Sequence, residues 1–227
     1  IKTVEALKEM PDFYVNTKLK FNGKGKEFET NIDYIDFKTD YSKIIGNGKF
    51  NSLTQEYEGE ILEANITSSE FPILKTVEGL KGMPNFQVNT SLKFRGKEKD
   101  LEADIDVLEL STEKSYLKAK GSINLKDLSY EGEILEASIN TKELPMLQSY
   151  PEFNLKTSFK IKGVNRDFKL DYNAQIDSLD YGAKFNNINL YGLVEFKNGE
   201  IYGNTEGYIK EFAFSNFFFR DLFVALE

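Results

Sequence analysis

The sequence contains a copy of itself, and this repetition limits the folds open to the chain more than any other feature. Residues 2–72 recur without a gap as residues 75–145, an offset of 73 residues (2 to 75), with about half of the positions identical. Residues 57–64 return unchanged as residues 130–137. Self-similarity of this kind is the signature of repeat architectures, in which each repeat is one structural unit. We therefore divide the chain into a first repeat at 1–72 and a second at 73–145.

A third, diverged repeat occupies residues 146–227. Its residues 151–163 match residues 84–96 in residue type at every second position, and after them only the spacing of apolar residues is retained. Ile1 stands inside the repeat pattern, and no initiating methionine precedes it. We expect the chain to be a segment of a longer protein.

Within each repeat, apolar and polar residues alternate, which is the period of a β-strand. In the first repeat the alternating segments are residues 15–21, 28–34, 44–50 and 57–61. A glycine–lysine turn at 22–26 separates the first two, and the same order recurs in the second repeat. The pattern predicts a mainly β, antiparallel fold with about four strands per repeat.

A short helix is predicted between repeats. Ser69 is a suitable N-cap, and the apolar positions from Phe71 to Leu80 are spaced for one helical face. Gly82 and Pro84 would end this helix, because glycine and proline are common just past a helix C-terminus. A shortened version is expected at residues 144–150.

The polar positions of neighbouring segments carry opposite charges. The cations are Lys18, Lys20, Lys93, Arg95, Lys160 and Lys162, and the anions are Glu29, Asp33, Glu102, Asp104 and Asp171. Opposite charges on adjacent strands attract each other and fix the pairing register. We interpret this side as a solvated sheet face without a ligand site.

Composition excludes several classes of chemistry. The chain has no cysteine and no histidine, so thiol catalysis, disulfides, cysteine–zinc sites and histidine-based catalytic triads are absent. The net charge is −8, whereas nucleic-acid readers carry a basic face. The paired carboxylates Glu58 and Glu60 recur as Glu131 and Glu133, and active sites rarely recur in tandem units. We expect no enzyme activity, no cofactor, no metal and no nucleic-acid partner.

The apolar positions define one continuous face that must be covered, because a sheet buries one side. A closed core and an open groove both satisfy this requirement. Continuity across repeats, small residues within strands and a lining without polar groups other than threonine favour a groove for acyl chains. The expected lining is Val15, Leu19, Phe21, Phe28, Ile32, Ile44, Phe50, Ile61, Val88, Leu92, Phe94, Leu101, Ile105, Leu117, Ile123, Ile134, Leu155, Phe159, Ile161, Phe168 and Leu170. The small residues expected to widen the groove are Gly46, Gly48, Gly59, Ala119, Gly121 and Gly132.

Short alternating strands that end in Lys-Phe-x-Gly or Ile-Lys-Gly resemble the TamB/AsmA-like superfamily of envelope proteins. The stretch from Ala64 to Gly96 is similar to the inter-repeat region of that family, and residues 158–192 are similar to its strands. The resemblance implies an elongated sheet of tandem repeats folded lengthwise into an apolar trough, termed a β-taco. It also implies a periplasmic location, an inner-membrane anchor outside this segment and an outer-membrane barrel partner of the BamA/TamA type. The implied function is carriage of phospholipid acyl chains between membranes, or help in outer-membrane protein assembly.

The alternative function is a structural or adhesive surface repeat with a closed core. The most apolar part of the chain bears on this choice, because it can form a buried last strand or a surface that contacts lipid or a partner. Its residues are Phe212, Phe214, Phe217, Phe218, Phe219 and Phe223.

Overall fold

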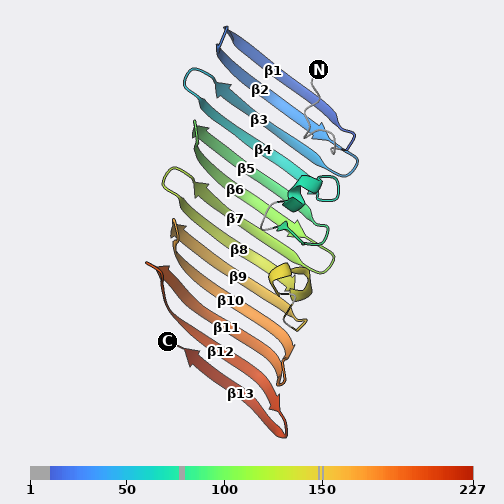
Figure 1. Cartoon of the computed structure of the whole chain (residues 1–227), viewed down its shortest axis with the longest axis vertical. Helices are drawn as coiled ribbons and strands as arrows, with labels where there is room; N and C mark the ends of the chain where they lie inside the picture. Colours follow the sequence, from blue (N-terminus) through green and yellow to red (C-terminus); the bar gives the residue numbers. More distant parts are fainter. Residues whose placement is uncertain (1–10, 77–79, 148, 150, 227) are drawn as a thin grey trace. The chain divides into compact units, whose positions relative to one another are not determined.

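The computed structural model describes residues 11–76, 80–147, 149 and 151–226. The fold is mainly β, with 73% of residues in strands and 5% in helical turns. Within the described residues, thirteen antiparallel strands form one sheet that is not closed, and their order in the sheet is their order in the chain (Figure 1). The predicted mainly β, antiparallel fold is therefore confirmed.

The first eight strands fall within the first two predicted repeats, four in each. They are β1 (Tyr14–Lys24), β2 (Glu27–Lys38), β3 (Lys43–Asn51), β4 (Glu56–Thr67), β5 (Gln87–Lys97), β6 (Asp100–Ser111), β7 (Tyr116–Asn124) and β8 (Ser129–Asn140). The region of the third predicted repeat has five strands and not four. They are β9 (Asn154–Val164), β10 (Asp167–Asp180), β11 (Lys184–Lys197), β12 (Glu200–Phe214) and β13 (Phe217–Leu226).

The chain divides into two compact units. Unit 1 comprises residues 1–113 and 122–126, and unit 2 comprises residues 114–121 and 127–227. Each unit is described separately below. In both, one side of the sheet carries the apolar positions and is called the apolar face. The opposite side is called the polar face.

The strands do not keep one alternation from end to end, because bulges shift its phase. In unit 1, Leu19 pairs with Ile32 but Thr17 pairs with Ile35, so the register shifts between them. Tyr34 pairs with Lys18, and its hydroxyl donates to Asn16 Oδ1 at 2.7 Å. The prediction that Tyr34 continues the apolar alternation is therefore wrong. A bulge adds one residue to one strand and so turns the following side chains to the other side.

The same shift occurs later in each unit. In unit 1 the pairing register shifts between Ile61 and Ala64 of β4, and in unit 2 it shifts between Ile134 and Ala137 of β8. Leu62 and Leu135 lie within these two shifts and are exposed, at 52% and 42%. The apolar residues beyond each bulge stay on the apolar face.

The helical turns in the connections after β4 and β8 are shorter and tighter than the predicted helices. The first contains a 3₁₀ helix, η2 (Pro72–Thr76), and the second contains η4 (Thr141–Glu143) and η5 (Pro145–Leu147). Ser69 lies in a turn before η2 and does not cap an α-helix. So few residues cannot offset the cost of starting an α-helix, and short 3₁₀ turns take its place. Val77, part of the predicted helical face, lies outside the described residues.

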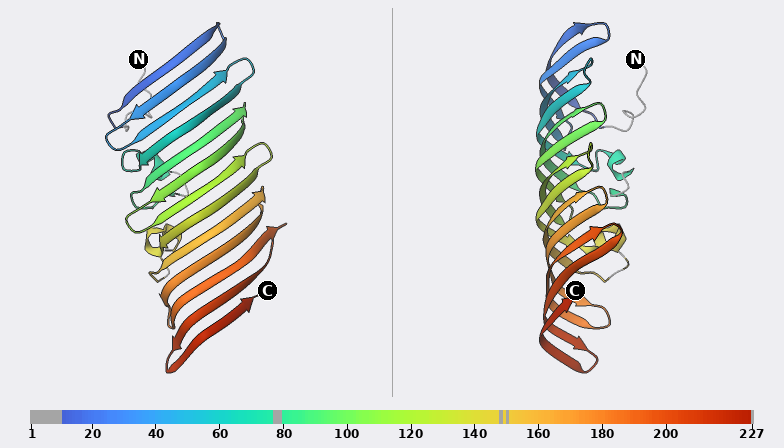
Figure 2. Two further views of the ribbon diagram at one scale, coloured as in Figure 1. Left: turned by 180° about the vertical axis from the view of Figure 1, so that it is seen from behind. Right: turned by 90° about the vertical axis from the view of Figure 1, so that its left-hand side faces the viewer.

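Buried apolar side chains are few among the described residues. They are Ala64 and Phe86 in unit 1, and Ala119, Ala137 and Ile188 in unit 2. Phe86 is the last residue of the connection that follows β4. In each unit the connection rises from one side of the sheet (Figure 2). Most of the sheet is consequently a single layer.

Candidate functional site

The predicted lining of the apolar face is never fully buried. Its residues are half-buried in the interior strands of both units and exposed at several positions of unit 1. The exposed ones are Val15, Leu19, Phe21, Phe50 and Ile123, with exposed fractions of 37–61%. A core residue of a closed sandwich would touch neighbours on every side. The half-buried lining thus belongs to a sheet face with one side open over much of its area.

Direct cross-strand partners connect the lining into rows. In unit 1, Leu92 of β5 pairs with Ile61 of β4 and with Ile105 of β6. In unit 2, Phe159 of β9 pairs with Ile134 of β8 and with Tyr172 of β10. The side chains of directly opposed residues lie on the same face and contact each other. Each row is therefore a continuous apolar strip across three strands.

Aromatic rings extend these strips in both units. In unit 1 the ring of Phe28 lies 5.0 Å from Phe21 and 5.9 Å from Phe50, centroid to centroid. In unit 2 the ring of Phe212 lies 4.9 Å from Phe185 and 5.9 Å from Phe219. These distances fall within the range of favourable ring pairs.

The phenylalanines of β13 are exposed rather than buried. Phe217, Phe218 and Phe223 have exposed fractions of 64%, 55% and 63%. Phe219 pairs with Phe212 on the apolar face, whereas Phe218 pairs with Ala213 on the opposite face. The guanidinium of Arg220 lies over the Phe218 ring at 5.2 Å. Of the two alternatives for this segment, the buried last strand does not form in this structure.

The small residues of the strands lie where neighbouring groups approach closely. A methyl group at Gly59 would lie 2.5 Å from Cζ of Phe94, whose ring occupies that space. A methyl group at Gly48 would lie 2.9 Å from the backbone oxygen of Glu58. At Gly132, the counterpart of Gly59, the nearest atom would be Cγ2 of Ile161 at 3.4 Å, an ordinary contact. The space at Gly59 is filled by an aromatic ring from the next strand.

The polar face of unit 1 bears the predicted ladder of opposite charges. The Nζ atoms of Lys18 and Lys20 lie 3.4 and 3.0 Å from Asp33 Oδ2. The hydrogen bond from Lys20 is the main reason why the pKa of Asp33 is below its usual value. Arg95 pairs with Glu102 as predicted, at 2.6 Å.

Two of the predicted cations form ion pairs with the preceding strand and not, as the sequence pattern predicted, with the following strand. Lys93 pairs with Glu60 at 3.7 Å, and Lys160 of unit 2 pairs with Glu133 at 3.5 Å. Asp104 and Asp171, which the alternation offered as partners, are exposed instead. Each cation lies between two strands, and periodicity alone does not decide which anion is nearer.

A hollow of about 590 Å³ in unit 1 is walled mostly by polar-face residues, and Ile32 and Phe94 of the predicted lining also border it. Its walls include Lys49, Glu58, Glu60, Lys93 and Arg95. Glu58 is paired with Lys49 at 2.8 Å, and Glu60 with Lys93. Both carboxylates are thus paired with cations of neighbouring strands.

In each unit, a glutamate in the connection after β4 or β8 accepts hydrogen bonds from the turn that precedes β3 or β7. The glutamates are Glu70 and Glu143, and we call this arrangement the loop clamp. In unit 1 the carboxylate of Glu70 accepts hydrogen bonds from Thr39 Oγ1 at 2.6 Å, from Ser42 Oγ and from the backbone N–H of Tyr41 at 3.1 Å. Partial burial alone would raise the pKa of Glu70, but these hydrogen bonds together hold it below its usual value. The clamp joins the turn between β2 and β3 to the connection after β4.

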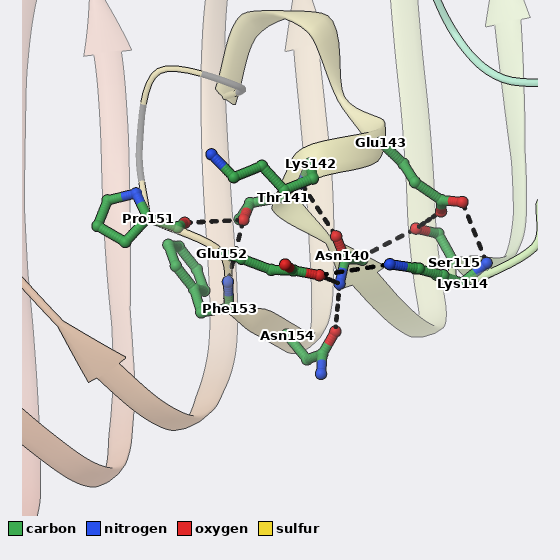
Figure 3. Close-up of polar contacts among 10 residues, drawn as sticks. All are labelled: Lys114, Ser115, Asn140, Thr141, Lys142, Glu143, Pro151, Glu152, Phe153 and Asn154. Atoms are coloured by element: carbon green, nitrogen blue, oxygen red, sulfur yellow. Dashed lines mark hydrogen bonds and ion pairs between the residues drawn. The ribbon is translucent and has the colours of Figure 1, made fainter.

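In unit 2, the carboxylate of Glu143 is the equivalent acceptor (Figure 3). It accepts hydrogen bonds from Ser115 Oγ and from the backbone N–H of Lys114 at 3.1 Å. The side-chain amide of Asn140 adds bonds to Glu152 at 3.0 Å and to Asn154 at 3.1 Å. The strand pattern did not predict this clamp. A signal was present in the loops, because polar residues there are identical in the two repeats: Ser42 matches Ser115, and Glu70 matches Glu143.

The base of each connection is closed by a reciprocal pair of hydrogen bonds. In unit 1, Ser68 N–H donates to the Phe86 carbonyl and Phe86 N–H donates to Ser68 Oγ, both at 2.9 Å. In unit 2, Thr141 and Phe153 make the equivalent pair, both at 3.1 Å. Ser68 and Thr141 are fully buried, so their hydroxyls satisfy backbone groups that water cannot reach.

No family model, curated protein or solved structure matches the chain. Within the described residues, no helix is long and apolar enough to cross a membrane. In the same part of the chain, no three acidic side chains come together as metal ligands.

Proposed function

We propose that this chain is a non-enzymatic lipid-binding segment whose apolar face holds the acyl chains of phospholipids. The supporting observation is the half-buried, uncharged lining that continues from strand to strand without a second layer over it. Covering apolar surface contributes roughly 25 cal/mol per Å², so an extended apolar ligand would be bound along the face rather than at one residue.

The chemistry of the lining supports an acyl chain over other ligands. Along the Ile61–Leu92–Ile105 row, the charged side chains belong to the opposite face, where Lys93 pairs with Glu60. A polar ligand would leave its hydrogen-bonding groups unsatisfied against such a row. A methylene chain has no such groups and adapts to irregular apolar surfaces.

The proposal also includes the repeat arrangement, a trough shape and a cellular location. Three tandem repeats would continue the apolar face, and bending along its length would convert that face into a trough. We propose that the segment lies in the periplasm of a double-membrane cell, anchored to the inner membrane elsewhere in its protein. An outer-membrane barrel of the BamA/TamA type would receive the lipid, or the face would assist assembly of such barrels. The TamB/AsmA-like resemblance of the strand pattern supports this placement.

The proposal is tested by photo-crosslinking in cells and by mass spectrometry of the purified protein. A crosslinking amino acid at Leu92 or Phe159 is expected to capture phospholipid. The matched controls are the adjacent positions Lys93 and Lys160, whose side chains lie on the polar face. Capture at the control positions equal to that at Leu92 and Phe159 would show that the face does not bind lipid selectively.

A substitution separates lipid carriage from a structural or adhesive role. Leu92→Arg places a charge on the apolar face and should abolish lipid capture at Phe159 if lipid moves along the face. A structural repeat with a closed core would retain no lipid in the unsubstituted protein. Absence of copurified lipid, with normal folding by circular dichroism, would favour that alternative.

A further inference from the structure

Part of the polar face of unit 2 carries neutral polar side chains, beside ion pairs such as Lys169 with Glu195 and Lys156 with Asp177. On β10, β11 and β12, two neighbouring rows of direct cross-strand partners carry amides, tyrosines and one carboxylate. The first row is Asn173, Tyr191 and Glu206, and the second is Gln175, Asn189 and Tyr208. We call these six residues the amide–tyrosine patch.

The amides of the patch have unused hydrogen-bonding capacity. The side chains of Asn173, Gln175 and Asn189 make no hydrogen bond to any residue that the structure describes, and Thr157 Oγ1 donates only to the backbone carbonyl of Asn173, at 2.8 Å. Asn186 on the same strand as Asn189 differs, since its amide donates to Glu211 at 3.1 Å. Each free amide offers two donors and one acceptor oxygen. Gln175 and Asn189 are half-buried, where unused polar groups are less common than at exposed sites.

The tyrosines of the patch are exposed and fixed in orientation. Tyr191 and Tyr208 have exposed fractions of 46% and 38%. Their hydroxyls donate to the carboxylates of Glu206 and Asp221, respectively. Hydrogen bonds to a carboxylate are stronger than those between neutral groups, so each ring is held in place. The two rings are partly exposed beside the free amides.

A hollow beside the patch provides room for a ligand. Its volume is about 320 Å³, and its walls include Leu135, Ser158, Asn173 and Tyr191. Lys160 also lines it, but this cation is paired with Glu133 at 3.5 Å. The patch itself carries a carboxylate and no cation, which disfavours phosphate, nucleic acid and other anionic ligands.

We propose that the amide–tyrosine patch binds a neutral polysaccharide chain. A sugar ring has an apolar face of C–H groups and a rim of hydroxyls, which fit an aromatic ring and amide or carboxylate groups, respectively. The patch spaces its groups about 5 Å apart between strands and about 7 Å apart along a strand, the scale of one sugar ring. Asn204 and the exposed Tyr202 continue the same face along β12, so the site accommodates more than one sugar. This site is on the face opposite to the lipid-binding lining and does not depend on the proposed function.

The inference is tested by calorimetric titration of the whole chain with chitohexaose and with cellohexaose. Saturable binding of at least one hexasaccharide is expected. Tyr191→Ala should weaken it about 3- to 10-fold, because an aromatic contact of this kind contributes roughly up to the 1.4 kcal/mol that corresponds to a factor of ten. Tyr191→Phe retains the ring and should bind within about threefold of the unsubstituted chain.

The matched control is Tyr181→Ala. Tyr181 is 71% exposed and lies in the turn between β10 and β11, outside the patch. This variant should bind as the unsubstituted chain does, and circular dichroism of each variant verifies folding. No saturable binding of either sugar at millimolar concentration would overturn the inference. Equal weakening by Tyr181→Ala and Tyr191→Ala would also overturn it.

Discussion

Ion pairs between strands lie on the polar faces of both units, and unit 2 also carries the amide–tyrosine patch. In unit 1 the side chains form ion pairs between strands, such as Lys49 with Glu58 and Arg95 with Glu102. In unit 2 the strands β10–β12 carry the amide–tyrosine patch, with one carboxylate and free amides. The apolar faces, in contrast, retain rows of aliphatic and aromatic residues in both units. The polar face is solvated, so its residues change without loss of packing, whereas the apolar positions are fixed by contact with their neighbours.

The largest difference that we expect between the units concerns one pair of equivalent glycines. Gly59→Ala should lower the free energy of unfolding by about 1–3 kcal/mol, because its methyl group meets the ring of Phe94 and the backbone oxygen of Asn47 at 2.8 Å. Gly132→Ala should change it by less than about 0.5 kcal/mol, since only an ordinary contact with Ile161 forms. Urea unfolding of both variants measures the difference. Equal effects would show that the crowding at Gly59 relaxes without cost.

The second-largest effect on stability should come from the loop clamp of unit 1. Glu70→Ala removes the shared acceptor of Thr39, Ser42 and Tyr41, and should lower the free energy of unfolding by about 1–2 kcal/mol, allowing for the partial exposure of Glu70. Asp40→Ala, in the same turn but with an exposed side chain, is the matched control and should have little effect. A loss as large for Asp40→Ala would assign the effect to the turn itself.

The same clamp should make stability depend on pH in the acid range. The pKa of Glu70 is lowered in the folded chain relative to its ordinary value of 4.5. Its stabilising effect is therefore complete above pH 4.5 and is lost as the pH falls through the folded pKa. Glu70→Gln should reduce this part of the acid sensitivity, measured as the urea midpoint between neutral pH and pH of about 3. An unchanged pH profile would exclude a contribution from Glu70.

The smallest effect should come from an exposed ion pair on the polar face of unit 1. Lys49 and Glu58 are 55% and 56% exposed, so their attraction is screened by solvent and salt. Lys49→Gln should shift the urea midpoint only slightly, and the shift should vanish in high salt. Asn189→Gln in unit 2 has no charge and should show no salt dependence. A large shift that persists in high salt would mean that Lys49 acts through packing and not through charge.

The sequence by itself determined the strand content, the antiparallel order and the two chemically distinct faces. Period-two alternation is a local property of the chain, so it predicts strands such as β5 and β9 without knowledge of their neighbours. The offset repetition also makes Gly59 equivalent to Gly132 and Glu70 equivalent to Glu143.

Only the tertiary structure decided where the alternation changes phase, which anion each cation selects and how the loops are joined. Tyr34 turns to the polar face because a bulge in β2 adds a residue, and Lys93 chooses Glu60 over Asp104 because β4 brings that carboxylate within 3.7 Å. The free amides beside Tyr191 are likewise a property of three paired strands. Contacts of this kind depend on the distances between strands, and a pattern along one strand does not contain them.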